Sequence, residues 1–345
     1  MNIKIASCPE GGYAHPKYGF YHIPKAFLLL ITGLVWLAAG GNIVRLGLSA
    51  GLLSAVPVPR TGKGGISMAT LYASDLDGTL LGPDGKLSPF SRDTINRLVE
   101  KGFPFTLATA RSVASARPIL AGLRLRLPCV MMNGVFLTDI ATERHAAVAY
   151  IPAETARRTV DTFLAHGRPP FVYTCPAGAG IDVVYTRLLH AYEENFAAER
   201  KSRYHSFRQA PDYVIGDRTV YINGIDRPEV ILPLYEAVGK IPGLAAVCYP
   251  DSYDSRYYYL ETFSHTAGKW QGIRRLAAME GFDTIVAIGD NLNDLEMLTK
   301  AHRGVAVANA QPEALRAADQ VIGPNGGDGV ARFLLEEAAK QGINL

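Results

Sequence analysis

The chain has 345 residues, of which 48% are hydrophobic and 19% are charged, and it carries a net charge of +3. This is an ordinary globular composition, and the length suits two domains or one domain with a large insertion. Six lysines and arginines stand against one acid in residues 1–67, whereas the rest holds 29 basic and 31 acidic residues. The globular part therefore has no basic excess, which argues against a nucleic-acid partner. The four cysteines form no Cys-x-x-Cys pair, so we interpret them as free thiols.

Near the start of the chain, residues 26–44 form an uncharged apolar stretch of 19 residues. As a helix it would be about 28 Å long, close to the thickness of a bilayer core. One interpretation is a membrane-spanning segment that anchors a cytoplasmic catalytic domain; a cleaved signal peptide fits less well, because 25 residues precede the stretch. The other interpretation is that residues 1–67 are an extension outside the working protein, because Met68 stands just before the first predicted core strand.

From residue 70 onward, apolar stretches alternate with amphipathic patterns. The stretches typical of buried strands are residues 70–74, 103–109, 129–133, 284–289 and 304–308. The predicted helices are residues 89–101, 112–120, 269–280, 292–301, 311–317 and 329–340. Such alternation predicts an α/β fold with a Rossmann-like, doubly wound parallel sheet that helices cover on both faces. A binding site is then expected beyond the carboxyl ends of the strands.

Residues 151 to about 262 interrupt this pattern. They are richer in aromatic and charged residues and have shorter strand signals. We interpret them as an antiparallel α+β module inserted between two parts of the core, residues 68–150 and 263–345.

Polar motifs follow four of the predicted elements. The first is Asp75-Leu76-Asp77-Gly78-Thr79, and the second is Thr109-Ala110-Arg111. Lys269 opens a predicted helix, and the last motif runs from Gly289 to Asp294. Because the ends of parallel strands meet at one edge of the sheet, we expect these side chains to converge there.

This set of residues suits phosphoryl transfer. Carboxylates that share a cleft repel one another unless a cation is bound, and oxygen ligands without His or Cys favour Mg²⁺. One carboxylate of the Asp75 and Asp77 pair could then attack phosphorus, and the other could carry the proton. A hydroxyl and an ammonium would bind the phosphoryl oxygens, and Gly78 would let the backbone turn close to the ligand.

The motifs "DLDGTLL" and "GDNLND" resemble those of the haloacid dehalogenase (HAD) superfamily, and specifically its Cof-type branch with a type IIB cap. The resemblance runs from about residue 69 to residue 335 and implies a HAD core with an inserted cap. It implies that Asp75 is the nucleophile, that Asp77 is the general acid/base, and that Thr109 and Lys269 are catalytic.

The same resemblance implies a metal site and a substrate site. The metal would be held by Asp75, the backbone carbonyl of Asp77, and Asp290 with Asp294. The implied substrate-binding residues are Gly78, Arg111, Asn133, Gly134 and Asn293. Two features depart from the family pattern: Ala110 replaces the usual glycine of the second motif, and "SHTAGKW" before and after Lys269 is irregular. Neither departure removes a catalytic group.

We therefore expect a Mg²⁺-dependent phosphatase that hydrolyses a small phosphorylated metabolite through an aspartyl-phosphate intermediate. Sugar phosphates are candidate substrates, as are nucleotide-like phosphates such as flavin mononucleotide or pyridoxal phosphate. A phosphomutase of the same superfamily is one alternative, and a membrane-attached regulatory protein with little turnover is another. The substrate and the oligomeric state stay open at this point.

Overall fold

The computed structural model describes residues 69–176, 180–251 and 254–345, together with three short strands near the N-terminus. The chain divides into two compact units, Met1–Ile66 and Ser67–Leu345. The strands of the first unit pair antiparallel in chain order. They are β1 (Leu29–Ile31), β2 (Leu34–Ala39) and β3 (Asn42–Gly47).

The described residues of segment 26–44 do not form the expected membrane-spanning helix. They lie in β1, β2 and β3, while residues 26–28, 32–33 and 40–41 lie outside the described part. The sequence supplies one reason, because the segment contains a Gly-Gly pair that is costly inside a helix, with strand-favouring Ile, Val and Trp on either side of it. None of the helices in the described part is long and apolar enough to cross a membrane.

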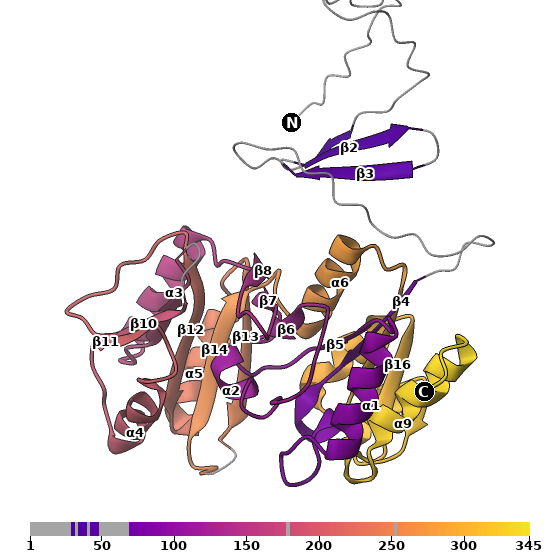
Figure 1. Ribbon diagram of the computed structural model, residues 1–345. Helices are drawn as coiled ribbons and strands as arrows, with labels where there is room; N and C mark the ends of the chain where they lie inside the picture. The colour runs from indigo at the N-terminus through magenta and orange to yellow at the C-terminus, as the bar shows by residue number, and fades with distance from the viewer. Residues whose placement is uncertain (1–28, 32–33, 40–41, 48–68, 177–179, 252–253) are drawn as a thin grey trace, which may run out of the picture. The chain divides into compact units, whose positions relative to one another are not determined.

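The second unit is built on a five-stranded, all-parallel sheet with the order β17-β16-β15-β4-β5 (Figure 1). Its strands are β4 (Thr70–Ser74), β5 (Phe105–Leu107), β15 (Thr284–Gly289), β16 (Arg303–Val307) and β17 (Gln320–Ile322). The first strand, β4, lies between β5 and β15, so segments from the two ends of the unit meet at the centre of the sheet.

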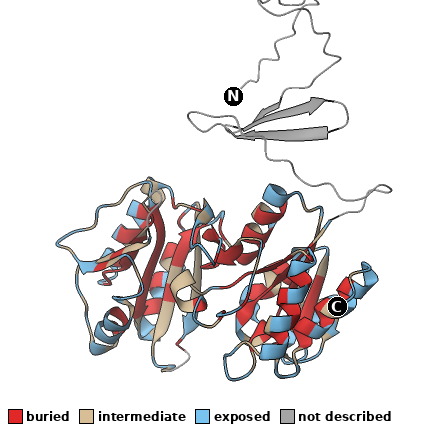
Figure 2. Ribbon diagram, in the orientation of Figure 1, coloured by how far each residue is buried: buried red, intermediate tan, exposed pale blue. Residues whose placement is uncertain are grey.

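Helices cover both faces of this core sheet. They are α1 (Pro89–Glu100), α2 (Val113–Ala116), α6 (Lys269–Glu280), α7 (Leu295–Lys300), α8 (Pro312–Ala317) and α9 (Gly329–Lys340). Leu71 and Ala73 of β4 pack with α6 residues such as Ile273, whereas Tyr72 packs with α1 and α9 residues such as Leu98. Because both faces are covered, the last four residues of β4 are all buried, and β5, β15 and β16 are largely buried as well (Figure 2). The doubly wound core predicted from the sequence is therefore confirmed.

The stretch 129–133 differs from its prediction as a core strand. It forms β6 (Cys129–Met131), which pairs antiparallel with β7 (Phe136–Thr138), and β8 (His145–Val148) completes a separate sheet. A single parallel bridge, from Ala108 to Val130, continues β5 onto it. The reason is a left-handed backbone after β6, with φ values of 47°, 51° and 81° at the next three residues, which reverses the chain.

An α+β cap with a six-stranded sheet of order β11-β10-β9-β12-β14-β13 is inserted between β8 and α6 (Figure 1). Its strands are β9 (Phe171–Thr174), β10 (Asp182–Tyr185), β11 (Ser206–Gln209), β12 (Thr219–Asp226), β13 (Leu244–Pro250) and β14 (Tyr258–Ser264). Its helices are α3 (Ala153–Ala165), α4 (Ala191–Arg200) and α5 (Pro228–Val238). The pair β10 and β11 is parallel and the other pairs are antiparallel, so the expected antiparallel module has one exception.

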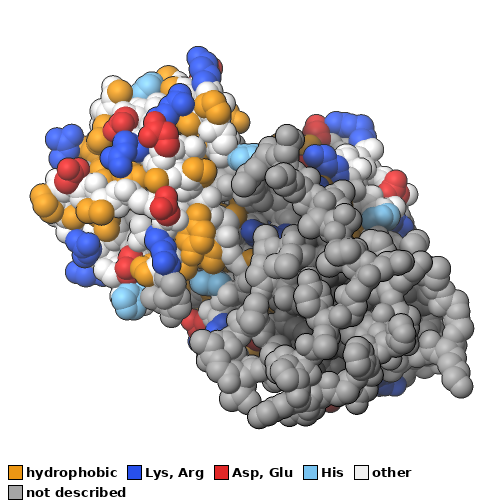
Figure 3. Space-filling model, turned by 90° about the horizontal axis from the view of Figure 1, so that it is seen from above, with side chains coloured by type: hydrophobic (Ala, Val, Ile, Leu, Met, Phe, Trp, Pro, Cys, Tyr) orange, Lys and Arg blue, Asp and Glu red, His pale blue; other side chains and the backbone are white. Residues whose placement is uncertain are grey.

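The two faces of the cap sheet are unlike. Leu260 and its same-face neighbours pack against apolar residues of α3 and α5, including Phe163 and Leu234. The opposite face carries residues such as Tyr221 and Tyr259, which belong to the same apolar cluster as the core. On the side of the molecule seen in Figure 3, charged side chains of both signs are interspersed with apolar ones over the visible part of the cap.

Candidate active site

The loop after β4 brings Asp75 to the carboxyl edge of the core sheet. The Asp75 N–H donates to the carbonyl of Ile288 in β15 (2.8 Å), which ties the end of β4 to the neighbouring strand. Gly78 follows with φ 77°, and a Cβ there would lie 2.3 Å from Asp290 Oδ2. Only glycine allows this approach, so Gly78 brings the loop against the Asp290 carboxylate. Asn309 Nδ2 donates to the Gly78 carbonyl (2.8 Å) and holds the loop from the end of β16.

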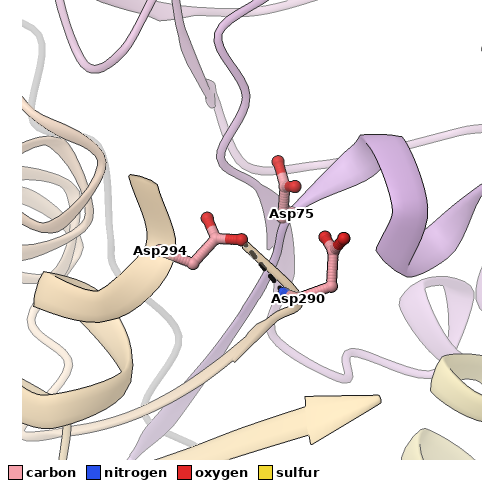
Figure 4. Close-up of side chains that lie close together, drawn as sticks. All are labelled: Asp75, Asp290 and Asp294. Atoms are coloured by element: carbon pink, nitrogen blue, oxygen red, sulfur yellow. Dashed lines mark hydrogen bonds between the residues drawn. The ribbon is translucent and has the colours of Figure 1, made fainter. Parts of the chain in front are cut away.

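Three carboxylates converge at this edge, as Figure 4 shows. Asp75, Asp290 and Asp294 each offer one oxygen, and these three oxygens lie within 4.8 Å of one another. Asp294 Oδ2 accepts the backbone N–H groups of Asp290 (3.0 Å) and Asn291 (3.1 Å), which fixes its orientation. A Cβ at Gly289 would lie 2.7 Å from the Cβ of Asp294, so a glycine is needed at the end of β15 as well.

Lys269 is buried against two of these acids. Its Nζ donates to Asp75 Oδ1 and to Asp294 Oδ1, both at 2.7 Å, and the residue is 4% exposed. Burial acts to lower the pKa of Lys269, but the attraction of Asp294 and Asp75 outweighs it and raises the pKa above its ordinary value. The lysine therefore stays an ammonium ion inside the site.

One lysine does not neutralise three acids. Burial, with repulsion from Asp294, raises the pKa of Asp75 well above its ordinary value despite Lys269. Burial also raises the pKa of Asp290, although the Thr79 hydroxyl, which donates to Asp290 Oδ1 at 2.6 Å, opposes the shift. Both carboxyls would ionise more readily beside a further cation.

These residues fit a divalent metal ion. The donors are hard carboxylate oxygens without His or Cys, which is the set that Mg²⁺ prefers. Both oxygens of Asp294 already accept hydrogen bonds, from Lys269 and from two backbone N–H groups. Asp75 and Asp290 are therefore the better direct ligands, and Asp294 is suited to orient Lys269 and the end of β15.

The turn after β6 positions Lys269. Gly268 N donates to the Asn133 carbonyl (2.7 Å), and a Cβ at Gly134 would lie 2.0 Å from the Gly268 carbonyl oxygen. The first turn of α6 thus rests directly on the backbone of this turn. Asn133 and Gly134, which the sequence predicts to bind substrate, contact the backbone of Gly268, the residue before Lys269.

The side chain of Asp77 does not join the cluster of Asp75, Asp290 and Asp294. Arg111 forms two parallel hydrogen bonds with it, from Nε to Oδ2 and from Nη2 to Oδ1, each 2.7 Å long. The Asp77 carboxylate is half exposed and lies outside the three-carboxylate cluster, so only its backbone carbonyl remains as its predicted metal contact. Thr109 is buried beside this pair, and its Oγ1 accepts the Arg111 N–H (3.1 Å). Asn293 is exposed, on the short helical turn Leu292–Asp294.

A cleft of about 1080 Å³ opens beside the Asp77 and Arg111 pair, between the core and the cap. The core wall includes Asp77, Arg111 and Ser112, and the cap wall comes from α4 and from one face of the cap sheet.

Sequence reasoning assigned no role to two residues that support the site. Thr79 binds Asp290, and its signal is its place directly after Gly78 in the first motif. Asn309 holds the Gly78 loop, and its signal is its place just past the end of β16, at the same edge of the sheet as the other strand ends. The cleft-lining cap residues were also missed, because their selection depends on which sheet face stays open.

Comparison with known proteins gives consistent results. The sequence model of haloacid dehalogenase-like hydrolases matches residues 72–334. A 5-amino-6-(5-phospho-D-ribitylamino)uracil phosphatase of Bacillus subtilis is 28% identical over 278 residues, covering 77% of this chain and 96% of the relative. A pyridoxal phosphate phosphatase of Escherichia coli is 25% identical over 275 residues, covering 76% and 97%. A haloacid dehalogenase-like hydrolase structure from Bacteroides thetaiotaomicron shares the fold with a TM-score of 0.62, at 24% identity, covering 78% and 99%.

Proposed function

Because the chain belongs to the haloacid dehalogenase-like hydrolases, in their Cof-type subfamily IIB, we propose that it is a Mg²⁺-dependent phosphatase working through an aspartyl-phosphate on Asp75. The two relatives described above are named as phosphatases of small phosphorylated metabolites, which agrees with this proposal. The observation that carries the proposal is the buried meeting of Asp75, Asp290 and Lys269 at one sheet edge.

In the first half-reaction an oxygen of Asp75 attacks phosphorus, and the bond from phosphorus to the leaving oxygen breaks. Asp77 gives that oxygen a proton, and the alcohol departs. In the second half-reaction Asp77 takes a proton from water, the water oxygen attacks phosphorus, and the acyl-phosphate bond breaks. Inorganic phosphate leaves and the Asp75 carboxylate is restored.

The other residues bind and orient. Lys269 favours the ionised form of Asp75 and places positive charge beside the phosphoryl oxygens, and Thr109 offers a hydroxyl to the same group. When bound at Asp75 and Asp290, Mg²⁺ would supply the charge neutralisation that lets a carboxylate approach a phosphate dianion. Asn133 and Gly134 hold α6, and with it Lys269, in register with β4.

The Asp77 and Arg111 pair must open during turnover. Both oxygens of the Asp77 carboxylate accept hydrogen bonds from the Arg111 guanidinium, so this carboxyl can face a leaving-group oxygen only after the pair separates. A phosphate dianion competes for the same guanidinium, so substrate binding would release the Asp77 side chain. Arg111 therefore acts as a binding residue that passes from Asp77 to the substrate.

The test is phosphate release by the purified chain from a panel of sugar phosphates, flavin mononucleotide and pyridoxal 5′-phosphate, with Mg²⁺ and with EDTA. We expect release that EDTA stops and that Asp75→Asn abolishes. Equal amounts of free alcohol and phosphate indicate hydrolysis, whereas transfer to a second position of the sugar would indicate a phosphomutase. No release from any compound with Mg²⁺ would contradict the proposal and favour the regulatory alternative.

A further inference from the structure

One face of the cap sheet presents a continuous aromatic wall to the cleft. Tyr173 and Tyr221 meet edge to face with ring centroids 5.7 Å apart, and Tyr249 and Tyr259 stack with centroids 5.7 Å apart. All four tyrosines line the cleft. They come from four neighbouring strands, and the alternation of each strand turns them to the same face. Such a wall suits a flat ring, because aromatic faces stack on planar groups.

Two polar side chains lie within this wall. Asn223 of β12 and Glu261 of β14 are directly opposite each other in the sheet, and both line the cleft. Glu261 Oε1 accepts the Tyr249 hydroxyl (2.7 Å). Glu261 Oε2 and Asn223 Oδ1 are buried and accept no hydrogen bond from the described residues.

These two oxygens call for donors from a ligand. A buried acceptor without a partner costs about 1–3 kcal/mol, so two of them on the wall of a cleft indicate a group that binds there. Burial raises the pKa of Glu261, against the opposing effects of the neighbouring Tyr221 and Tyr249 hydroxyls and of the charge of Arg200. A donor that carries positive charge would satisfy this carboxyl better than a neutral hydroxyl, and it would also be attracted to the faces of the tyrosines.

We propose, building on the phosphatase function above, that this face selects a leaving group containing a planar nitrogen heterocycle with N–H donors. Glu261 and Asn223 accept hydrogen bonds from the N–H groups, and the tyrosine rings stack on the heterocycle. The geometry permits this, because Asp77 and Arg111 line the opposite wall of the same cleft. A substrate with its phosphate on the core side then extends its leaving group toward the cap wall.

The experiment compares kcat/KM of the full chain with Mg²⁺ for four phosphates. Pyridoxamine 5′-phosphate has a flat ring with nitrogen donors, benzyl phosphate has a flat ring without them, and glucose 6-phosphate and ribose 5-phosphate offer hydroxyls only. We expect pyridoxamine 5′-phosphate to exceed each of the others by tenfold or more. A sugar phosphate that equals or exceeds it, or benzyl phosphate at the same level, would overturn the proposal.

Glu261→Gln places an NH₂ group where the structure has an acceptor. It should lower the preference for pyridoxamine 5′-phosphate over benzyl phosphate about tenfold, and Asn223→Ala should lower it in the same direction if Glu261→Gln does not fold. The matched control is Glu199→Gln, which removes the same charge from an exposed residue of the same cleft and should alter both values by the same factor. Equal effects of Glu261→Gln and Glu199→Gln on the preference would refute the role of Glu261.

A binding measurement separates this inference from the proposed function. Calorimetric titration of the Asp75→Asn chain with pyridoxamine 5′-phosphate and with benzyl phosphate needs no turnover. Tighter binding of pyridoxamine 5′-phosphate supports the inference even if no phosphate is released, in which case only the phosphatase proposal fails. Equal binding overturns the inference even if phosphate release is observed.

Discussion

Replacing Gly134 by alanine should disable the site from a distance. The new Cβ would lie 2.0 Å from the Gly268 carbonyl oxygen, whereas ordinary contact begins near 3.4 Å, so the two backbones must separate by about 1.4 Å. No side-chain rotation relieves this overlap, because the neighbour is backbone. Gly268 directly precedes Lys269, and an error of about 1 Å in a catalytic group can cost roughly 100-fold in rate. We therefore expect kcat to fall by about 100-fold or more.

The control residue is Gly281, which lies at the C-terminal end of α6, the helix that Lys269 begins. Gly281 has φ 78°, nearly the 81° of Gly134, but a Cβ there would meet nothing within 4 Å. Gly281→Ala should therefore show only the left-handed backbone cost of about 1–2 kcal/mol in urea unfolding, with kcat preserved. Phosphate release is measured on both variants after circular dichroism has shown that they are folded. If folded Gly134→Ala keeps kcat within threefold of the parent chain, the turn does not position Lys269.

Three further outcomes follow from the buried charges and from the division of the chain. In EDTA, Asp75→Asn should gain stability relative to the parent chain as pH rises above about 4. The reason is that the pKa of Asp75 is raised in the folded state, so ionisation of Asp75 opposes folding of the parent chain. Thermal melts of both proteins from about pH 4 to 8 test this, and a difference in melting temperature that stays constant with pH would contradict it. Thr79→Val should cost about 1–3 kcal/mol in urea unfolding, because the buried Asp290 carboxylate loses its 2.6 Å hydrogen bond, and a loss below the error of the measurement would mean that the bond contributes nothing. A chain starting at Ser67 should keep its phosphatase activity, because residues 67–345 form their own compact unit; loss of activity in a folded truncation would assign residues 1–66 a part in function.

Much of the core could be predicted because its elements follow from local pattern. The strand at residues 70–74 and the helices beginning at Lys269 and Gly329 have the bounds that their apolar spacing indicates. Buried strands covered on both faces leave long apolar runs, and parallel topology places their polar successors together. Asp75, Asp290 and Asp294 meet for that reason.

One remaining feature is local. A left-handed backbone at Met132 and Asn133 turns β6 into a hairpin, and its signal is the Asn-Gly pair at residues 133–134 and not an apolar pattern. The other features depend on contacts between distant segments. The bond between Asp77 and Arg111 depends on how two loops face each other. The wall with Glu261 depends on which face α3 and α5 cover, and the alternation of apolar and polar residues within β14 leaves that choice open.

The insertion of the cap has a consequence for how the protein is made. The central strand β4 has β15 as a neighbour, and the whole cap is synthesised between them. While the ribosome is still translating, the cap can therefore complete its own sheet before the sheet that carries Asp75 has its second half. Lys269 and Asp294 are made only after the cap, so a nascent chain that ends before β15 would leave one edge of β4 unpaired, and an unpaired strand edge is prone to aggregation.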